Sequence, residues 1–256
     1  MESATERQRK VTYLPTTEAY NLWAEHYDHD GNFLQLLDSR ELPRLLEDAF
    51  KCLSGRPRPW KAVDLGAGSG RATMALLASD VGESATNIIA VDASSAMLAI
   101  AKRKVADAKN NDRQSMINFE VMDLLSDEEL PQSVLGADLV VSTLVLEHVP
   151  CDLYFKKASR ILSRGGVLLV TNMHHDMGAI SQAGFVDPKT NEKIRPASYP
   201  HSVEDIKTAA SKYGLTLLGD VKEVAVEERD VASLGDRSRK WIGVRCWYGG
   251  LFQKSS

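Results

Sequence analysis

The chain has 256 residues, of which 43 % are hydrophobic and 26 % are charged, and this composition excludes collagen-like and disordered sequences. A net charge of −4 argues against a nucleic-acid-binding protein, and three widely spaced cysteines argue against a disulfide framework. No N-terminal apolar region indicates a secretory signal, and no apolar run is as long as a membrane-spanning helix needs. We therefore expect a soluble, cytoplasmic protein that forms a single domain over 1–256.

Residues 1–59 form an N-terminal segment in which two helices are predicted. The first, over 17–28, spaces Tyr20, Trp23 and Tyr27 by three and four residues, which places them on one face. The second repeats that spacing over 42–49, with Pro43 expected in its first turn, where a missing N–H has little effect.

From Trp60 onward, short apolar runs alternate with helical segments, which favours a doubly wound α/β core over 60–173. The apolar runs lack clean alternation, as is typical of strands buried on both faces of a parallel sheet. They occur at 61–65, 87–92, 117–123, 137–145 and 166–172. Helices are expected between them at 71–79, 95–108 and 152–163.

The remaining chain differs from this core. Residues 174–201 are polar and rich in turns, and we expect them to pass over the active face as a lid. Residues 202–256 are expected to form a closing helix (203–213) and strands, beginning with 215–226. The aromatic residues of the last segment are interpreted as sheet packing rather than substrate wall: Trp241, Trp247, Tyr248 and Phe252.

The strongest motif is VDLGAGSGR at 63–71, between a predicted strand and a predicted helix. Gly66 and Gly68 remove side chains from a tight turn, so the backbone can approach a ligand at the helix N-terminus. Arg71 stands where the dinucleotide fingerprint G-x-G-x-x-G requires its third glycine. Asp64, just before the turn, suits a cationic, amino-bearing ligand better than a pyrophosphate. A ligand-free loop is the alternative interpretation.

Two further acids end the next predicted strands. Asp92 follows the glycines by about twenty residues, where an acid can accept hydrogen bonds from ribose hydroxyls. The alternative is that Asp92 caps the next helix, a role that Ser94 or Ser95 can also fill. Asp123 ends the third strand, in MDLL. All three acids are therefore expected at the carboxyl edge, where open α/β sheets bind ligands.

With these motifs, the chain resembles the class I S-adenosylmethionine-dependent methyltransferases over roughly 18–173. VDLGAGSG is similar to their first motif, and MDLL, ADLVVSTLVLEHVP and RILSRGGVLLVTN are similar to later ones. YNLWAEHYD resembles the leading helix of the ubiquinone/menaquinone-type and Williams–Beuren-region-type proteins. The resemblance implies a Rossmann-like, mostly parallel seven-stranded sheet with an antiparallel last strand, an N-terminal helical segment and a lid insertion.

The resemblance also implies S-adenosylmethionine as the cofactor. Asp64 would lie near its amino group, Asp92 would hold the ribose hydroxyls, and Asp123 would bind the adenine amino group. Tyr20 or Tyr27 would approach the cofactor carboxylate. The full set of expected cofactor contacts is Tyr20, Tyr27, Asp64, Gly66, Ala67, Gly68, Asp92, Ala93, Met97, Asp123, Leu124 and Thr143.

The catalytic residues are less constrained. If the acceptor must lose a proton, His148 is the first candidate base, because the resembled fold places its loop near the transferred methyl group. Glu147 would orient His148, and His174 is a further candidate on the same sheet edge. The alternative is that His148 only caps or packs in the loop. Pro150-Cys151 superficially resembles the motif of cytosine C5 enzymes, but no general base partner is evident nearby.

His174, His175 and Asp176 also resemble a set of metal ligands. We predict no metal, because adjacent histidines on an extended chain point to opposite sides and cannot easily bind one ion.

The sequence therefore predicts a methyltransferase that methylates O, N, S or C of a small-molecule metabolite by in-line displacement. No Asn/Asp-Pro-Pro-aromatic motif follows the fourth strand, which disfavours adenine amines and glutamine amides as acceptors. The alternatives are a protein or RNA methyltransferase and a non-catalytic, cofactor-binding regulatory subunit. The expected partner is the small-molecule acceptor, with no nucleic acid and no membrane span, and the chain is expected to be a monomer or homodimer.

Overall fold

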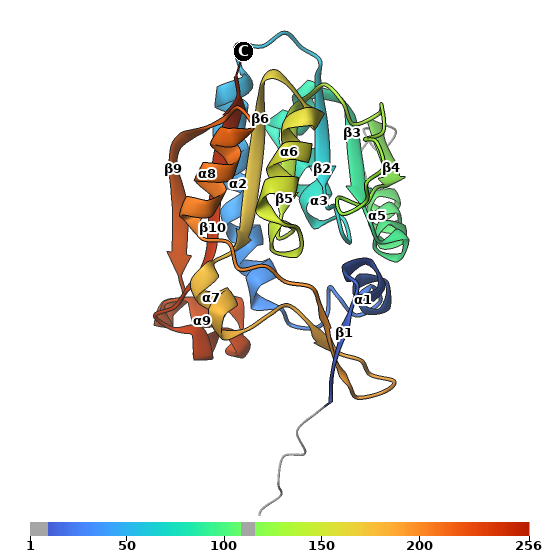
Figure 1. The fold of residues 1–256 in the computed structure, drawn as a ribbon, viewed down its shortest axis with the longest axis vertical. Helices are drawn as coiled ribbons and strands as arrows, with labels where there is room; N and C mark the ends of the chain where they lie inside the picture. Colours follow the sequence, from blue (N-terminus) through green and yellow to red (C-terminus); the bar gives the residue numbers. More distant parts are fainter. Residues whose placement is uncertain (1–9, 109–115, 256) are drawn as a thin grey trace, which may run out of the picture.

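A seven-stranded sheet forms the centre of the protein in this computed structural model, which describes residues 10–108 and 116–255 (Figure 1). Its strand order is β4-β3-β2-β5-β6-β10-β9. β10 is antiparallel to both of its neighbours, and the other adjacent pairs are parallel. The predicted doubly wound, mostly parallel sheet with an antiparallel last strand is thus confirmed. The strands are β2 (Trp60–Leu65), β3 (Ala85–Asp92), β4 (Ile117–Val121), β5 (Ala137–Thr143), β6 (Leu162–Met173), β9 (Leu215–Ala225) and β10 (Arg245–Lys254).

Helices cover both faces of the sheet, and each face has its own hydrophobic core. Neighbouring residues of one strand enter opposite cores, as Val140 and Val141 do. This explains why the strand sequences are continuously apolar rather than alternating. One core includes α6 (Cys151–Ile161) and α8 (Val203–Lys212). The other includes α2 (Phe33–Leu53), α3 (Arg71–Leu77), α4 (Asp80–Ser84) and α5 (Ser95–Asp107).

The N-terminal helices differ from those predicted. α1 (Thr16–Trp23) is shorter than expected, and turns follow it. α2 begins nine residues before the predicted 42–49, because Asn32 caps it by accepting a hydrogen bond from Leu34 N. Pro43 therefore lies inside α2, and its predicted place in a first turn is wrong. Burial of apolar side chains on both sides of Pro43 favours the continuous helix.

The predicted lid contains regular structure of its own. Residues 174–201 include α7 (His175–Ile180), β7 (Phe185–Val186) and β8 (Lys193–Pro196). β8 pairs in parallel with β1 (Val11–Leu14), a strand that the sequence analysis did not anticipate, and the three strands form a separate sheet. The ring of Trp23 in α1 stacks on Phe185, with ring centroids 5.0 Å apart. α1 and this small sheet lie beyond the carboxyl ends of β2 and β3 (Figure 1).

The closing segment agrees with the prediction in its helix α8 and its strands β9 and β10. Between these strands the chain forms η3 (Glu228–Asp230), α9 (Val231–Leu234) and η4 (Asp236–Trp241). All four aromatic residues that were interpreted as packing are buried: Trp241, Trp247, Tyr248 and Phe252. Among the described residues, no helix combines the length and the apolar character needed to cross a bilayer.

Candidate active site

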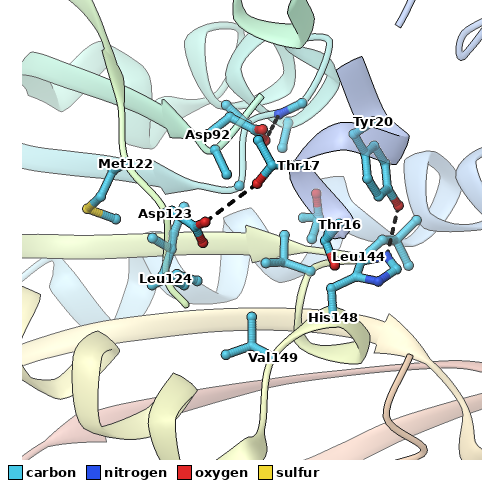
Figure 2. A pocket seen from close by; sticks show the side chains of 18 of the residues that line it. Thr16, Thr17, Tyr20, Asp92, Met122, Asp123, Leu124, Leu144, His148 and Val149 are labelled. Carbon is cyan, nitrogen blue, oxygen red and sulfur yellow. Dashed lines mark hydrogen bonds between the residues drawn. The ribbon is translucent and has the colours of Figure 1, made fainter. Parts of the chain in front are cut away.

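A cavity opens at the carboxyl edge of the sheet, between α1 and the loops that follow β2, β3, β4 and β5 (Figure 2). This first cavity brings together most of the residues predicted from the sequence. Those that line it are Tyr20, Tyr27, Gly66, Ala67, Gly68, Asp92, Ala93, Asp123, Leu124, Thr143 and His148. The edge is the expected one, because parallel strands direct their following loops to the same side.

The glycine-rich loop after β2 is shaped by its backbone. Gly66 has φ +81°, and a Cβ there would lie 2.2 Å from Val145 Cγ2, so only glycine fits. Gly68 has φ +55°, and apart from Gly68 and its two neighbours no described residue has an atom within 4 Å of the place a Cβ would take. Since Gly68 lines the cavity, the space beside it is open to a ligand.

Asp92, at the end of β3, is fixed by two backbone donors. Its Oδ2 accepts a hydrogen bond from Gly68 N at 2.8 Å, and its Oδ1 accepts one from Ser94 N at 2.7 Å. Ser94 is the N-cap of α5, because its Oγ accepts from Met97 N. Burial raises the pKa of Asp92, and these hydrogen bonds oppose the rise. The carboxylate therefore ties the glycine loop to the start of α5 while facing the cavity.

Asp123 follows β4, the strand next to β3, and lines the same cavity. Its Oδ1 accepts a hydrogen bond from Leu125 N at 2.8 Å, and Thr17 Oγ1 lies 3.5 Å from its Oδ2 (Figure 2). Thr17 is in the first turn of α1, so the N-terminal segment closes over the acids at the sheet edge.

Two predicted cofactor contacts lie outside this cavity. Asp64 is completely buried, and its Oδ2 accepts a hydrogen bond from Thr73 Oγ1 at 2.5 Å. Burial raises the pKa of Asp64 to about 6. Met97 is also completely buried, in α5. The structure therefore does not bring either side chain to the cavity wall, because Asp64 is hydrogen-bonded to Thr73 in α3 and Met97 is buried in α5.

His148 lies after β5 and joins the cavity to α1. Its Nδ1 lies 2.8 Å from the carbonyl oxygen of Ala197, which can only accept, so Nδ1 carries a proton. In the neutral ring Nε2 is then the acceptor, and the Tyr20 hydroxyl, 2.8 Å away, donates to it (Figure 2). Burial lowers the pKa of His148, but Glu147 and the Ala197 carbonyl outweigh burial and raise it above 6.5.

Glu147 is buried beside His148. Its Oε1 lies 3.4 Å from His148 Nε2, and its Oε2 has no hydrogen-bond partner among the described residues. Its backbone is held on both sides, because Glu147 N donates to Asn172 Oδ1 and Glu147 O accepts from Tyr199 N in the lid. A buried carboxylate with a vacant acceptor position is poised to bind a donor or to stabilise a cation.

His174 lies directly after β6, away from His148. It is completely buried, its Nε2 lies 2.6 Å from Glu223 Oε1, and its Nδ1 accepts a hydrogen bond from Asp176 N at the start of α7. It lines neither the first cavity nor the one beside it, so the structure does not bring it together with His148.

The neighbouring histidines also differ from the expected geometry. The rings of His174 and His175 lie on the same side, with centroids 4.4 Å apart, and their ligand atoms fall within 4.8 Å of Asp176. The predicted divergence is wrong, because α7 begins at His175 and the chain there is no longer extended. Both nitrogens of His174 are already engaged, and Asp176 pairs with Arg245 at 2.8 Å. The cluster is a hydrogen-bonded network linking β6, α7, β9 and β10.

Arg71 is a residue of the first cavity that sequence reasoning missed. One terminal nitrogen lies 2.5 Å from Asp38 Oδ2, and the other donates to Thr143 Oγ1 at 3.0 Å. Asp38 is completely buried and also accepts a hydrogen bond from Trp247 Nε1. The only signal in the sequence was the position of Arg71 directly after the glycine motif, because Asp38 and Trp247 are remote in the chain.

A second cavity adjoins the first and shares Tyr20, Tyr27 and Leu144 with it. Leu144 has φ +58°, a strained conformation for a branched side chain, and its N–H donates to Thr171 O at 2.9 Å. The other walls come from the segment between α1 and α2, the end of β6, α7, the lid and η4. Glu147 lines this second cavity, whereas His148 lines the first.

Comparison with known proteins identifies the family to which the chain is similar. Residues 63–170 match the family described as a methyltransferase domain. An uncharacterized methyltransferase of Emericella nidulans is 44 % identical over 263 residues, which cover 94 % of this chain and 91 % of that protein.

Solved structures with the same fold are more distant in sequence. An S-adenosylmethionine-dependent methyltransferase from Clostridium acetobutylicum has a TM-score of 0.58 at 16 % identity and covers 86 % of this chain and 93 % of its own. A geranyl diphosphate methyltransferase has a TM-score of 0.52 at 16 % identity, with 81 % of this chain and 76 % of its own covered. Taken with the fold and the first cavity, these relatives show that the chain belongs to the class I S-adenosylmethionine-dependent methyltransferases.

Proposed function

We propose that this methyltransferase acts on a small molecule bound in the second cavity. The observation that carries this proposal is the contact between the two cavities at Tyr20, Tyr27 and Leu144. A methyl group leaving the first cavity there would enter a space walled by the lid, α7 and η4. Such a space suits a small acceptor better than a folded macromolecule.

The chemistry of the first cavity supports its assignment to the cofactor. The space beside Gly68 leaves room for a ligand close to the backbone, and in this proposal Asp92 binds the ribose hydroxyls and Asp123 binds the adenine amino group. Arg71 lines this cavity while paired with Asp38, and in this proposal it also binds the cofactor carboxylate. When bound, S-adenosylmethionine supplies a methyl group on a positively charged sulfur.

Tyr20, His148 and Glu147 form a proton relay in this proposal. Tyr20 lines both cavities, so an acceptor proton can pass to its oxygen while its own proton moves to His148 Nε2. The carboxylate of Glu147, 3.4 Å from Nε2, stabilises the resulting imidazolium. The acceptor atom forms a bond to the methyl carbon, and the carbon–sulfur bond breaks with its electron pair on sulfur.

The test uses methyl-labelled S-adenosylmethionine with an extract of Emericella nidulans, separated afterwards into small molecules and macromolecules. We expect label among the small molecules, at a level that Asp92→Ala strongly reduces. Label in protein or RNA would contradict the small-molecule proposal. Absence of transfer, with cofactor binding confirmed by calorimetry, would favour a binding subunit without turnover.

A further inference from the structure

Among the described residues that line the second cavity, three cations outnumber two carboxylates. Lys193 in β8 and Arg237 and Lys240 in η4 all line it. Among residues 10–108 and 116–255, no carboxylate lies within 4.0 Å of the side-chain nitrogens of these three residues. The lid and the segment before β10 are far apart in sequence, so only the tertiary structure collects these cations.

Each cation is held by a neutral group. Lys193 Nζ donates to the carbonyl oxygen of Gly184 at 3.2 Å, and Arg237 donates to the backbone oxygen of Asp30. Lys240 Nζ lies 5.1 Å from the centre of the Trp241 ring. These contacts orient the side chains without neutralising their charge.

The two carboxylates that line the second cavity, Asp30 and Glu147, have other close contacts. Asp30 accepts hydrogen bonds from Trp23 Nε1 at 3.1 Å and from Asn32 N at 2.9 Å. Burial raises its pKa, and these hydrogen bonds together with Arg237 and Lys193 oppose the rise. Glu147 lies beside His148, at the contact with the first cavity. Lys193 is half-buried, and its pKa is lowered first by burial and then by Arg195, Arg237 and Lys240, with Asp30 opposing. Lys193, Arg237 and Lys240 therefore repel one another even with Asp30 nearby.

Building on the proposed function, we propose that the methyl acceptor is a small organic anion, with a carboxylate or phosphate group bound by Lys193, Arg237 and Lys240. The reacting O–H or N–H group then lies toward Tyr20 and Glu147, because these residues mark the boundary with the first cavity. One end of the acceptor is recognised by charge and the other is presented for methylation. Arginine and lysine together suit carboxylate and phosphate equally.

The acceptor's charge is tested with small molecules from Emericella nidulans, separated by anion exchange at pH 8 into bound anions and an unbound fraction. Each fraction is incubated with the enzyme and methyl-labelled cofactor. We expect label in the anionic fraction, and separate arms with carboxylic acids and phosphate monoesters distinguish the two anions. Label in the unbound fraction overturns the anionic acceptor but leaves small-molecule methylation standing. Label in no small-molecule fraction contradicts the proposed function itself.

Substitutions in the lid then test whether Lys193 binds the anionic group of the acceptor. Lys193→Gln should raise KM for the anionic acceptor by roughly 10- to 100-fold, because a charged hydrogen bond is lost. Its kcat and cofactor affinity should change little, and Lys193→Arg should restore most of the lost affinity. Lys189→Gln removes the same charge from an exposed position of the same hairpin and should leave KM within about twofold. An unchanged KM in Lys193→Gln, or an equal rise in Lys189→Gln, overturns the assignment.

Discussion

The two cavities differ in how their charged groups are held. In the first, Asp92 and Asp123 accept hydrogen bonds from backbone N–H groups, and Arg71 pairs with the buried Asp38. In the second, Glu147 Oε2 has no partner among the described residues, and Lys193 donates only to a backbone carbonyl. The first cavity is therefore preorganised before its ligand binds. In the second cavity, by contrast, the charged side chains depend on the ligand for hydrogen-bond and ion-pair partners.

This difference predicts separable effects of substitutions. Changes at the contact between the cavities should alter turnover, and changes at the edge of β3 should alter cofactor affinity. Changes in the glycine loop should alter folding as well as binding.

The largest effect is expected at His148. His148→Gln should lower kcat by roughly 10²- to 10⁴-fold, because the relay loses its base. The dissociation constant of S-adenosylmethionine should change by no more than about threefold. Steady-state kinetics and calorimetry check the two values, with His26→Gln, an exposed histidine after α1, as the control. A parallel loss of cofactor affinity would show that His148 serves cofactor binding rather than the relay.

The pH dependence of kcat/KM tests the assignment of His148 as the base. The base must be neutral, and its pKa lies above 6.5, so kcat/KM should rise as pH increases through that raised value. In Glu147→Gln, burial still lowers the pKa of His148, but the opposing carboxylate is gone. The rise should therefore move to lower pH. An unshifted profile in this variant would exclude Glu147 as the residue that tunes His148.

A smaller but selective effect is expected at Asp92. Asp92→Ala should weaken S-adenosylmethionine binding about 100-fold, because two ribose hydroxyls lose a charged acceptor. Calorimetric titration measures this loss, and Asp220→Ala, an exposed acid of β9, is the matched control. Unchanged affinity in Asp92→Ala would contradict the cofactor assignment at β3.

The smallest effects separate two glycines of one loop. Gly66→Ala and Gly68→Ala each place a side chain at positive φ, which costs about 1–2 kcal/mol. Gly66→Ala should lose about 1–3 kcal/mol more of the free energy of unfolding, because its Cβ meets Val145. Chemical denaturation without cofactor measures the difference. Equal losses of stability in the two variants would mean that the loop shifts to accommodate a Cβ at position 66.

The sequence by itself determined the core of the sheet and most of the first cavity. The strand–glycine–helix motif and the acids Asp92 and Asp123 act through backbone geometry within a few residues of each strand end, so local pattern was sufficient. The place of Pro43 was wrongly predicted, because α2 starts at the Asn32 cap and is continued through Pro43 by burial of its apolar side chains. β1 was not predicted, because it pairs with the remote β8.

Only the tertiary structure decided which residues face which cavity. Asp64 and Met97 follow the family pattern but are buried away from the cavity lining, and His174 is engaged with Glu223. The second cavity collects Glu147, Lys193 and Arg237 from distant segments that carry no shared motif. The lid packs against α1, and η4 packs against the start of α2 and the segment before it. These contacts between remote segments, rather than local sequence, set the positions of the three residues.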